Sequence, residues 1–195
     1  MRLRALWHRW RTLVPERARR RRRAHRLYVE LVGQARHPLF YGWLGVPDTP
    51  EGRFEMVALH VALLLRRLGA EGPSGRGLGQ EVFDLMFADM DVNLREIGVG
   101  DLSVGRYVKR LARNFFARMA ALDAGLADPD LGAIAAMLRS NVYHGAAPPD
   151  PSQVEGLAGY LIGLDRMLAS QSAEALLSGQ VRLPEPVAGQ ASEAP

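Results

Sequence analysis

Apolar residues recur at intervals of three and four along most of this chain, the spacing that places side chains on one face of an α-helix. The clearest series comprises Phe54, Val57, Val61, Leu64, Leu65 and Leu68. Helix starts are indicated by a capping residue followed by proline at Thr49-Pro50, Asp128-Pro129 and Asp150-Pro151. No segment shows the alternation of a β-strand, and no hairpin or internal repeat is evident. We therefore predict an all-α fold, a single compact bundle of about five to seven helices.

The composition divides the chain into three parts. Residues 1–36 form a basic N-terminal arm and helix: residues 1–26 contain eleven arginines and one acid, Glu16, although the whole chain carries only +4. Residues 37–178 hold most of the apolar series and should form a mildly acidic helical domain. Residues 179–195 contain three prolines and few apolar side chains, so we expect a disordered tail. Because the positive charge belongs to one arm, specific DNA binding is not expected.

The first fourteen residues have the pattern of a basic amphipathic helix, since leucines and tryptophans recur at helical spacing among arginines. Such a helix suits the interface of an anionic membrane, and arginine-rich, acid-poor N-termini are also typical of organelle import sequences. Pro15 is expected to open a second helical stretch, whose arginine block could contact ribosomal RNA through its phosphates. A disordered solubilising arm is the alternative. The candidate residues for membrane or ribosome binding are Leu3, Trp7, Trp10, Arg19, Arg20, Arg21, Arg22 and Arg23.

A glycine-rich segment at residues 69–77 is expected to be a flexible link, with the next helix running from about Leu78 to Ile97. In that helix Asp89, Asn93 and Glu96 form a polar stripe within the apolar arc, where an unpartnered charge is costly to bury. One interpretation pairs the two acids with arginines of neighbouring helices. The other makes the stripe a polar contact site in a binding groove. Catalysis by the carboxylates is disfavoured, because no nucleophile, metal-binding histidine or phosphate loop accompanies them.

The helix expected from residue 104 to about residue 122 has a basic face opposite its apolar one. This face comprises Arg106, Lys109, Arg110 and Arg113. A solvated face is the usual meaning of such a pattern, but it could also contact an acidic client, an RNA backbone or the carboxylates of the preceding helix. A further candidate surface is the connection at residues 37–48, where Phe40, Tyr41 and Trp43 are apolar enough that the segment must pack on something.

No cofactor, metal or membrane span is indicated. The chain has no cysteine, and its five histidines lack the spacing of a helical metal site. His60 shares a stripe with Arg53 and Arg67, so we expect it at the edge of the core rather than at its centre or as a haem ligand. The longest apolar run, residues 56–65, is about half of the roughly 20 residues that span a bilayer. No secretory signal is visible, so the protein is expected to stay where it is made.

Several stretches together resemble a known family. They are FYGWLGVPDTPEGRFEMVALHVALLLRRL, FDLMFADMDVNLREIGVGD, KRLARNFFARMAALDAGL and LGAIAAMLRSNVY, which cover roughly residues 37–143. On these segments the chain resembles the ubiquinol–cytochrome c chaperone family. The form of the arm and the compact length are closer to bacterial members than to mitochondrial ones.

The resemblance implies a non-enzymatic assembly chaperone that binds newly made cytochrome b and assists biogenesis of the ubiquinol–cytochrome c reductase (bc1, complex III). It implies a cytoplasmic protein, peripheral on the inner face of the inner membrane, or a mitochondrial matrix protein if the source is eukaryotic. A ribosome contact and a partner chaperone are compatible with it. Our hypothesis places the client on Phe40, Tyr41, Trp43, Asp89, Asn93, Glu96, Arg106, Lys109, Arg110 and Arg113.

Two other classes of function stay open on the residues alone. One is a peripheral membrane or RNA-binding adaptor that acts through the basic arm, and deletion of residues 1–26 should abolish its function. The other is a helical carrier of haem or quinone, which should show a spectral or thermal shift when the ligand is added.

Overall fold

The computed structural model describes residues 2–96, 101–127, 130–144 and 149–186, with the side chains of residues 2–15, 101–104, 106 and 107 outside this description. Every regular element in these ranges is a helix, which confirms the all-α prediction. The elements are α1 (Arg2–Ala35), α2 (Pro38–Gly42), α3 (Pro50–Gly69), α4 (Gly72–Glu96), α5 (Asp101–Ala127), α6 (Leu131–Asn141), α7 (Pro151–Ser170) and α8 (Ala173–Ser178).

Helix α3 lies at the centre of the bundle and contacts α1, α4, α5 and α7. Its start follows the sequence prediction: the Thr49 hydroxyl oxygen accepts a hydrogen bond from the Gly52 amide at 3.1 Å, and Pro50 occupies the first turn. All of its residues from Phe54 to Leu64 are buried, because neighbouring helices cover it on several sides. This burial makes α3 the main source of the hydrophobic core.

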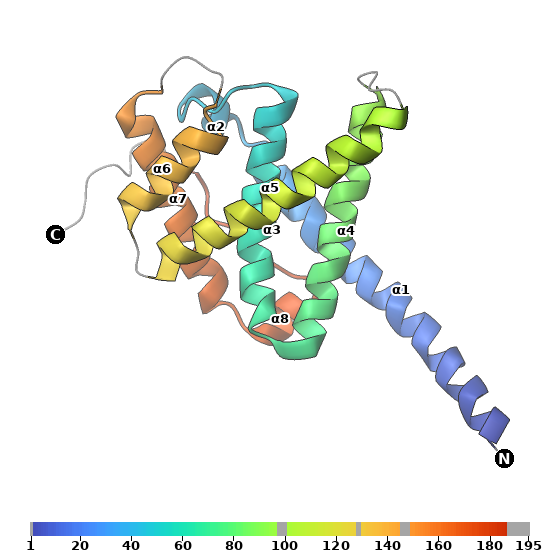
Figure 1. Cartoon of the computed structure of the whole chain (residues 1–195). Coiled ribbons are helices and arrows are strands. Elements are labelled where there is room, and N and C mark those ends of the chain that lie inside the picture. Colours follow the sequence, from blue (N-terminus) through green and yellow to red (C-terminus); the bar gives the residue numbers. More distant parts are fainter. Residues whose placement is uncertain (1, 97–100, 128–129, 145–148, 187–195) are drawn as a thin grey trace.

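Helix α1 crosses the back of the bundle, and its first half extends away from it (Figure 1). The second half is held by Ala24, Leu27 and Leu31, all fully buried, against α3 and α4. The helix is continuous through Pro15, so the expected restart at this residue is wrong. A proline removes one hydrogen bond from a helix, but the turns on either side keep theirs.

The link expected at residues 69–77 is shorter than predicted, because α4 already begins at Gly72. Gly72 has a φ of +67°, which reverses the chain directly after α3. A β-carbon on Gly75 would lie 2.1 Å from the Leu68 carbonyl oxygen. The glycines therefore allow a tight turn between two packed helices, whereas the sequence pattern was interpreted as flexibility.

The C-terminal part follows the predicted helices more closely. Asp150 caps α7 as predicted, and Gln153 completes a capping box with it. Helix α6 is capped by Asp130, whereas the expected start at Asp128-Pro129 lies outside the described residues. Residues 179–186, expected to be disordered, pack on the bundle: Gln171 side-chain atoms bond the Arg182 backbone, at 2.7 Å for the Arg182 amide. The rest of the expected tail, residues 187–195, is outside the described part.

Candidate functional site

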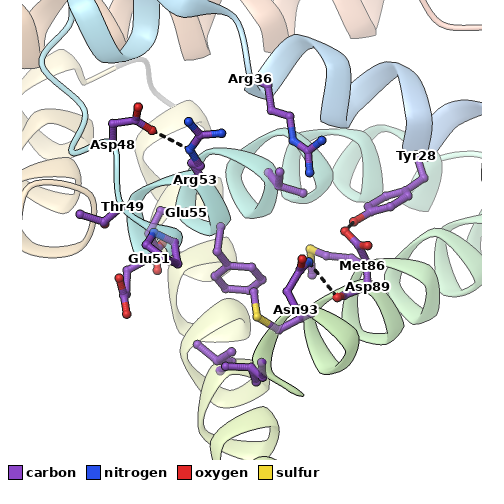
Figure 2. A pocket seen from close by; sticks show the side chains of 16 residues that line it. Tyr28, Arg36, Asp48, Thr49, Glu51, Arg53, Glu55, Met86, Asp89 and Asn93 are labelled. Atoms are coloured by element: carbon purple, nitrogen blue, oxygen red, sulfur yellow. Dashed lines mark hydrogen bonds and ion pairs between the residues drawn. The ribbon is translucent and has the colours of Figure 1, made fainter. Parts of the chain in front are cut away.

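A cavity of about 360 Å³ opens between α1, α3, α4 and α5, beside the loop that leads into α3. Figure 2 shows the side chains that surround it. Its apolar wall consists of Phe54, Val57, Met86, Met90, Leu94 and Leu111. Two of these residues are methionines, whose flexible thioether side chains adapt to apolar surfaces of different shape. The cavity can therefore accept an apolar group from outside the chain.

Polar groups stand at the rim of this cavity. The Tyr28 hydroxyl donates a hydrogen bond to Asp89 Oδ2 at 2.9 Å, which joins α1 to α4. Burial, together with this carboxylate, raises the pKa of the Tyr28 hydroxyl, so Tyr28 stays a donor. The Asn93 amide donates to the Asp89 carbonyl oxygen at 2.9 Å, and Arg36 reaches over the cavity from the end of α1 (Figure 2). An apolar interior with a hydrogen-bonding rim suits an amphipathic segment.

The polar stripe predicted on α4 is placed differently from our expectation. Asp89, Asn93 and Glu96 are exposed, because the end of α4 is covered on fewer sides than its beginning. Asp89 is bonded by the phenol of Tyr28, and no arginine among the described side chains pairs with it. Asp89 and Asn93 line the cavity, whereas Glu96 does not. The burial expected for the stripe is therefore wrong, although two of its members lie at one candidate site.

The basic face predicted on α5 is exposed at Lys109, Arg110 and Arg113, and none of the three lines the cavity. The side chain of Arg106 lies outside the described residues. Leu111 faces the cavity from α5 instead. The described members of this face and the α4 stripe therefore do not form one site.

The predicted aromatic connection is divided between core and surface. Phe40 is fully buried in α2, with its ring edge-to-face with Tyr160 at 4.9 Å, so its side chain belongs to the core in this structure and not to the surface. Tyr41 is half-buried and donates to the Ala35 carbonyl oxygen at 2.8 Å. Trp43 is 57% exposed and borders a second cavity of about 500 Å³ beside α7.

His60 is fully buried rather than at the edge of the core. Its Nδ1 is 2.7 Å from the Met56 carbonyl oxygen and its Nε2 is 2.8 Å from the Tyr160 hydroxyl. Burial lowers the pKa of His60 to about 4, so the ring is neutral at neutral pH. The expectation failed because α7, distant in sequence, supplies Tyr160 and covers this side of α3. His60 has a structural role, with both ring nitrogens engaged.

A buried ion pair between α3 and α5 was not predicted. Arg118 Nη2 lies 2.8 Å from Glu55 Oε1, and Arg118 Nε donates to Asn141 Oδ1 of α6 at 3.0 Å. Burial raises the pKa of Glu55 to about 7, and the guanidinium of Arg118 opposes this rise. The signal in the sequence was an acid inside the apolar series of α3, between Phe54 and Met56. The pair and the Asn141 hydrogen bond join three helices, and Glu55 itself lines the cavity.

The arginine block of α1 has two kinds of members. Arg20 pairs with Glu81 of α4 at 3.0 Å, and Arg23 pairs with Glu16 at 3.3 Å, with Arg19 3.9 Å from the same glutamate. Arg21 and Arg22 are exposed. Arg20 thus helps to hold α1 on the bundle. The side chains of Leu3, Trp7 and Trp10 are outside the described residues.

No group of three or more His, Asp or Glu side chains in the described part of the chain is placed to hold a metal ion. None of the helices described is long and apolar enough to cross a bilayer.

Comparison with known proteins places the chain in a family. The model of the family described as Ubiquinol-cytochrome C chaperone matches residues 43–183. Ubiquinol-cytochrome c reductase complex assembly factor 1 of Mus musculus is 29% identical over 160 residues, which cover 82% of this chain and 54% of the mouse protein. The Homo sapiens protein of the same name is 28% identical over 159 residues, 81% of this chain and 52% of the human protein. The chain therefore spans about half the length of these two relatives.

A similar protein of known structure also supports the family assignment. The crystal structure of the Cbp3 homolog from Brucella abortus superposes with a TM-score of 0.80 at 35% sequence identity, covering 89% of this chain and 96% of that chain. The matched family region contains most of the residues that line the cavity, with Tyr28 and Arg36 of the α1 region outside it. The resemblance seen in the sequence is confirmed: this chain belongs to the ubiquinol–cytochrome c chaperone family.

Proposed function

We propose that this protein is a non-enzymatic assembly chaperone of the ubiquinol–cytochrome c reductase, and that its client is newly made cytochrome b. The observation that carries the proposal is the match of the family model over residues 43–183, together with relatives named as assembly factors of that complex. The cavity provides a place where such a client could bind. A chaperone of a membrane protein must shield apolar segments, and the cavity presents an apolar wall to its opening.

The client contact is proposed at the cavity between α1, α3, α4 and α5. Met86 and Met90 give this wall an adaptable surface, as suits a site that must hold a segment before it reaches its final packing. Asp89, Asn93 and Arg36 at the rim can bond backbone groups of the segment. Because these groups and the apolar wall come from different helices, binding depends on the folded bundle.

Replacing Met90 by lysine is expected to weaken capture of cytochrome b by about tenfold or more, because an ammonium group in the apolar wall must lose its hydration when a client enters. Met90 is only half-buried, so the helical structure should be kept. The measurement is the amount of cytochrome b recovered with the tagged protein from growing cells, identified by mass spectrometry.

The matched control is Met167→Lys on α7, a half-buried methionine that does not line this cavity. Circular dichroism and thermal unfolding of both variants establish that each is folded. Equal loss of cytochrome b from both variants, or no loss from either, would contradict the proposed site. Failure to recover cytochrome b with the wild-type chain would contradict the proposed client.

We also propose that the protein lies peripherally on an anionic membrane surface, with α1 as the contact. The support is the extension of α1 beyond the bundle (Figure 1). In addition, Arg21 and Arg22 of this helix are exposed. Arginines near an anionic surface contribute about 1 kcal/mol each. This localisation would hold the cavity close to the place where a membrane-protein client is inserted.

The double variant Arg21→Glu, Arg22→Glu is expected to reduce binding to vesicles containing phosphatidylglycerol by about tenfold or more, because two attractive charges become repulsive. The measurement is co-sedimentation with these vesicles and with neutral phosphatidylcholine vesicles. The control, Arg139→Glu with Arg166→Glu, makes the same change of net charge at exposed positions on α6 and α7. Equal effects of the two double variants would show that α1 is not the contact.

A further inference from the structure

The outer side of the α4–α5 pair carries an aromatic strip, Phe83, Phe87 and Phe116. The Phe116 ring is 53% exposed and stacks on the Phe83 ring at 5.4 Å with an interplanar angle of 29°. Phe87 is 4.6 Å from Phe83, measured between ring centroids. This row of rings extends from the core to the surface and leaves apolar area in contact with water, which is unfavourable. Exposed aromatic strips of this kind are typical of protein contacts.

Charges of opposite sign flank this strip on the two helices. On the α5 side, Lys109 and Arg113 precede Phe116 by seven and three residues, so they lie on its helical stripe, and both are exposed. Within the described residues neither side chain makes an ion pair. On the α4 side, the exposed Asp84 follows Phe83, and among the described residues its carboxylate is bonded only by the side-chain amide of Gln80, at 2.8 Å. One side of the strip is therefore basic and the other acidic.

We propose that a second copy of this chain docks on the α4–α5 surface, with the two aromatic strips in contact. A surface with one basic and one acidic side is electrostatically complementary to a second copy of itself when the two-fold rotation axis lies in the interface, parallel to the strip. That axis places the α5 side of each copy over the α4 side of the other, so Arg113 of one copy meets Asp84 of its partner. An axis across the strip would instead bring like charges together.

This self-complementarity is what favours a second copy over another occupant. A partner of one charge would match one side of the strip and be repelled by the other. The proposed surface also uses none of the residues that line the client cavity, so two copies could dock while both cavities stay open. The inference is independent of the proposed client.

The test uses two single charge reversals, Arg113→Glu and Asp84→Lys, measured by sedimentation velocity over a range of protein concentrations. The wild-type chain should show a concentration-dependent dimer. Each variant alone should dimerise at least about tenfold more weakly, because both symmetric contacts become repulsive. Mixing the two variants should restore the dimer. In the mixed pair, the introduced glutamate of one variant meets the introduced lysine of the other, and the second contact keeps the original Arg113 and Asp84.

Arg139→Glu on α6 is the control and should leave the dimer unchanged. A wild-type chain that stays monomeric up to high concentration would overturn the proposal. A dimer that neither reversal weakens, or one that the mixture does not restore, would do the same, because it would form through another surface. Phe116→Ala provides a further check, since loss of the exposed ring should weaken the dimer without a change of charge.

Discussion

Replacing Arg118 by methionine should lower the free energy of unfolding by about 3–5 kcal/mol at pH 8.5, because it leaves the carboxylate of Glu55 in the core without its partner. Glu55 is only 7% exposed, and its Oε2 has no hydrogen-bond partner among the described residues even with Arg118 present. Removal of Arg118 also breaks the hydrogen bond to Asn141 that joins α5 to α6. Urea unfolding followed by circular dichroism measures this loss.

The pH dependence of the Arg118 variant identifies the cause. The pKa of Glu55 is raised to about 7 by burial, from an ordinary value of 4.5, and loss of Arg118 can only raise it further. Because the pKa of Glu55 is higher in the folded than in the unfolded state, protonation of its carboxyl favours the folded state. This contribution to stability is complete below pH 4.5 and is lost as the pH rises through the folded-state pKa. The Arg118→Met variant should therefore be less destabilised at pH 6 than at pH 8.5.

The double variant Glu55→Leu, Arg118→Met serves as the control, since it removes both charges and should recover most of the lost stability. A destabilisation by Arg118→Met that is equal at pH 6 and pH 8.5 would contradict this account. It would indicate that lost packing, and not the buried carboxylate, dominates.

The fold should lose about 3 kcal/mol of stability as the pH falls from 7 to 4, because His60 is protonated in the unfolded state before it is protonated in the folded state. Its pKa is about 4 when folded and 6.5 when unfolded. The stabilisation is complete above pH 6.5, where both states are neutral at this ring, and is lost as the pH falls toward the folded-state pKa. The cause is full burial of the ring between Met56 and Tyr160.

Glu55 has the opposite pH dependence in an overlapping range, so the effect of His60 is best measured in a Glu55→Gln background. In that background, thermal unfolding should show the loss between pH 7 and pH 4, and the additional change His60→Gln should remove it, because glutamine does not titrate. An equal loss with glutamine at position 60 would assign the acid sensitivity to other groups.

The helices were predictable where local signals agree. Thr49-Pro50 and Asp150-Pro151 cap helices as expected, because a cap depends on residues within one turn. The environment of a residue was not predictable where a distant helix determines it. His60 is central only because α7 covers it, and Asp89 is satisfied by Tyr28, which is 61 residues away.

The candidate site was predictable only in part for the same reason. A helical wheel placed Asp89 and Asn93 on one stripe, and both line the cavity, but it could not show that the other side of the cavity belongs to α1 and α3. Phe40 and Trp43 are both aromatic residues of the same short connection, so the sequence gives no reason to treat them differently. In the structure Phe40 is fully buried and Trp43 is 57% exposed. The difference arises from the single turn of α2, which directs Phe40 toward His60 and Tyr160.

Photo-crosslinking from the cavity in living cells tests directly whether cytochrome b binds there. A photoreactive amino acid replaces Met90 in the cavity wall or, as the control, Arg166 on the exposed side of α7. We expect a crosslinked product containing cytochrome b from position 90 and none from position 166. Cytochrome b bound equally from both positions would contradict the cavity as the client site, and its absence from both would contradict cytochrome b as the client.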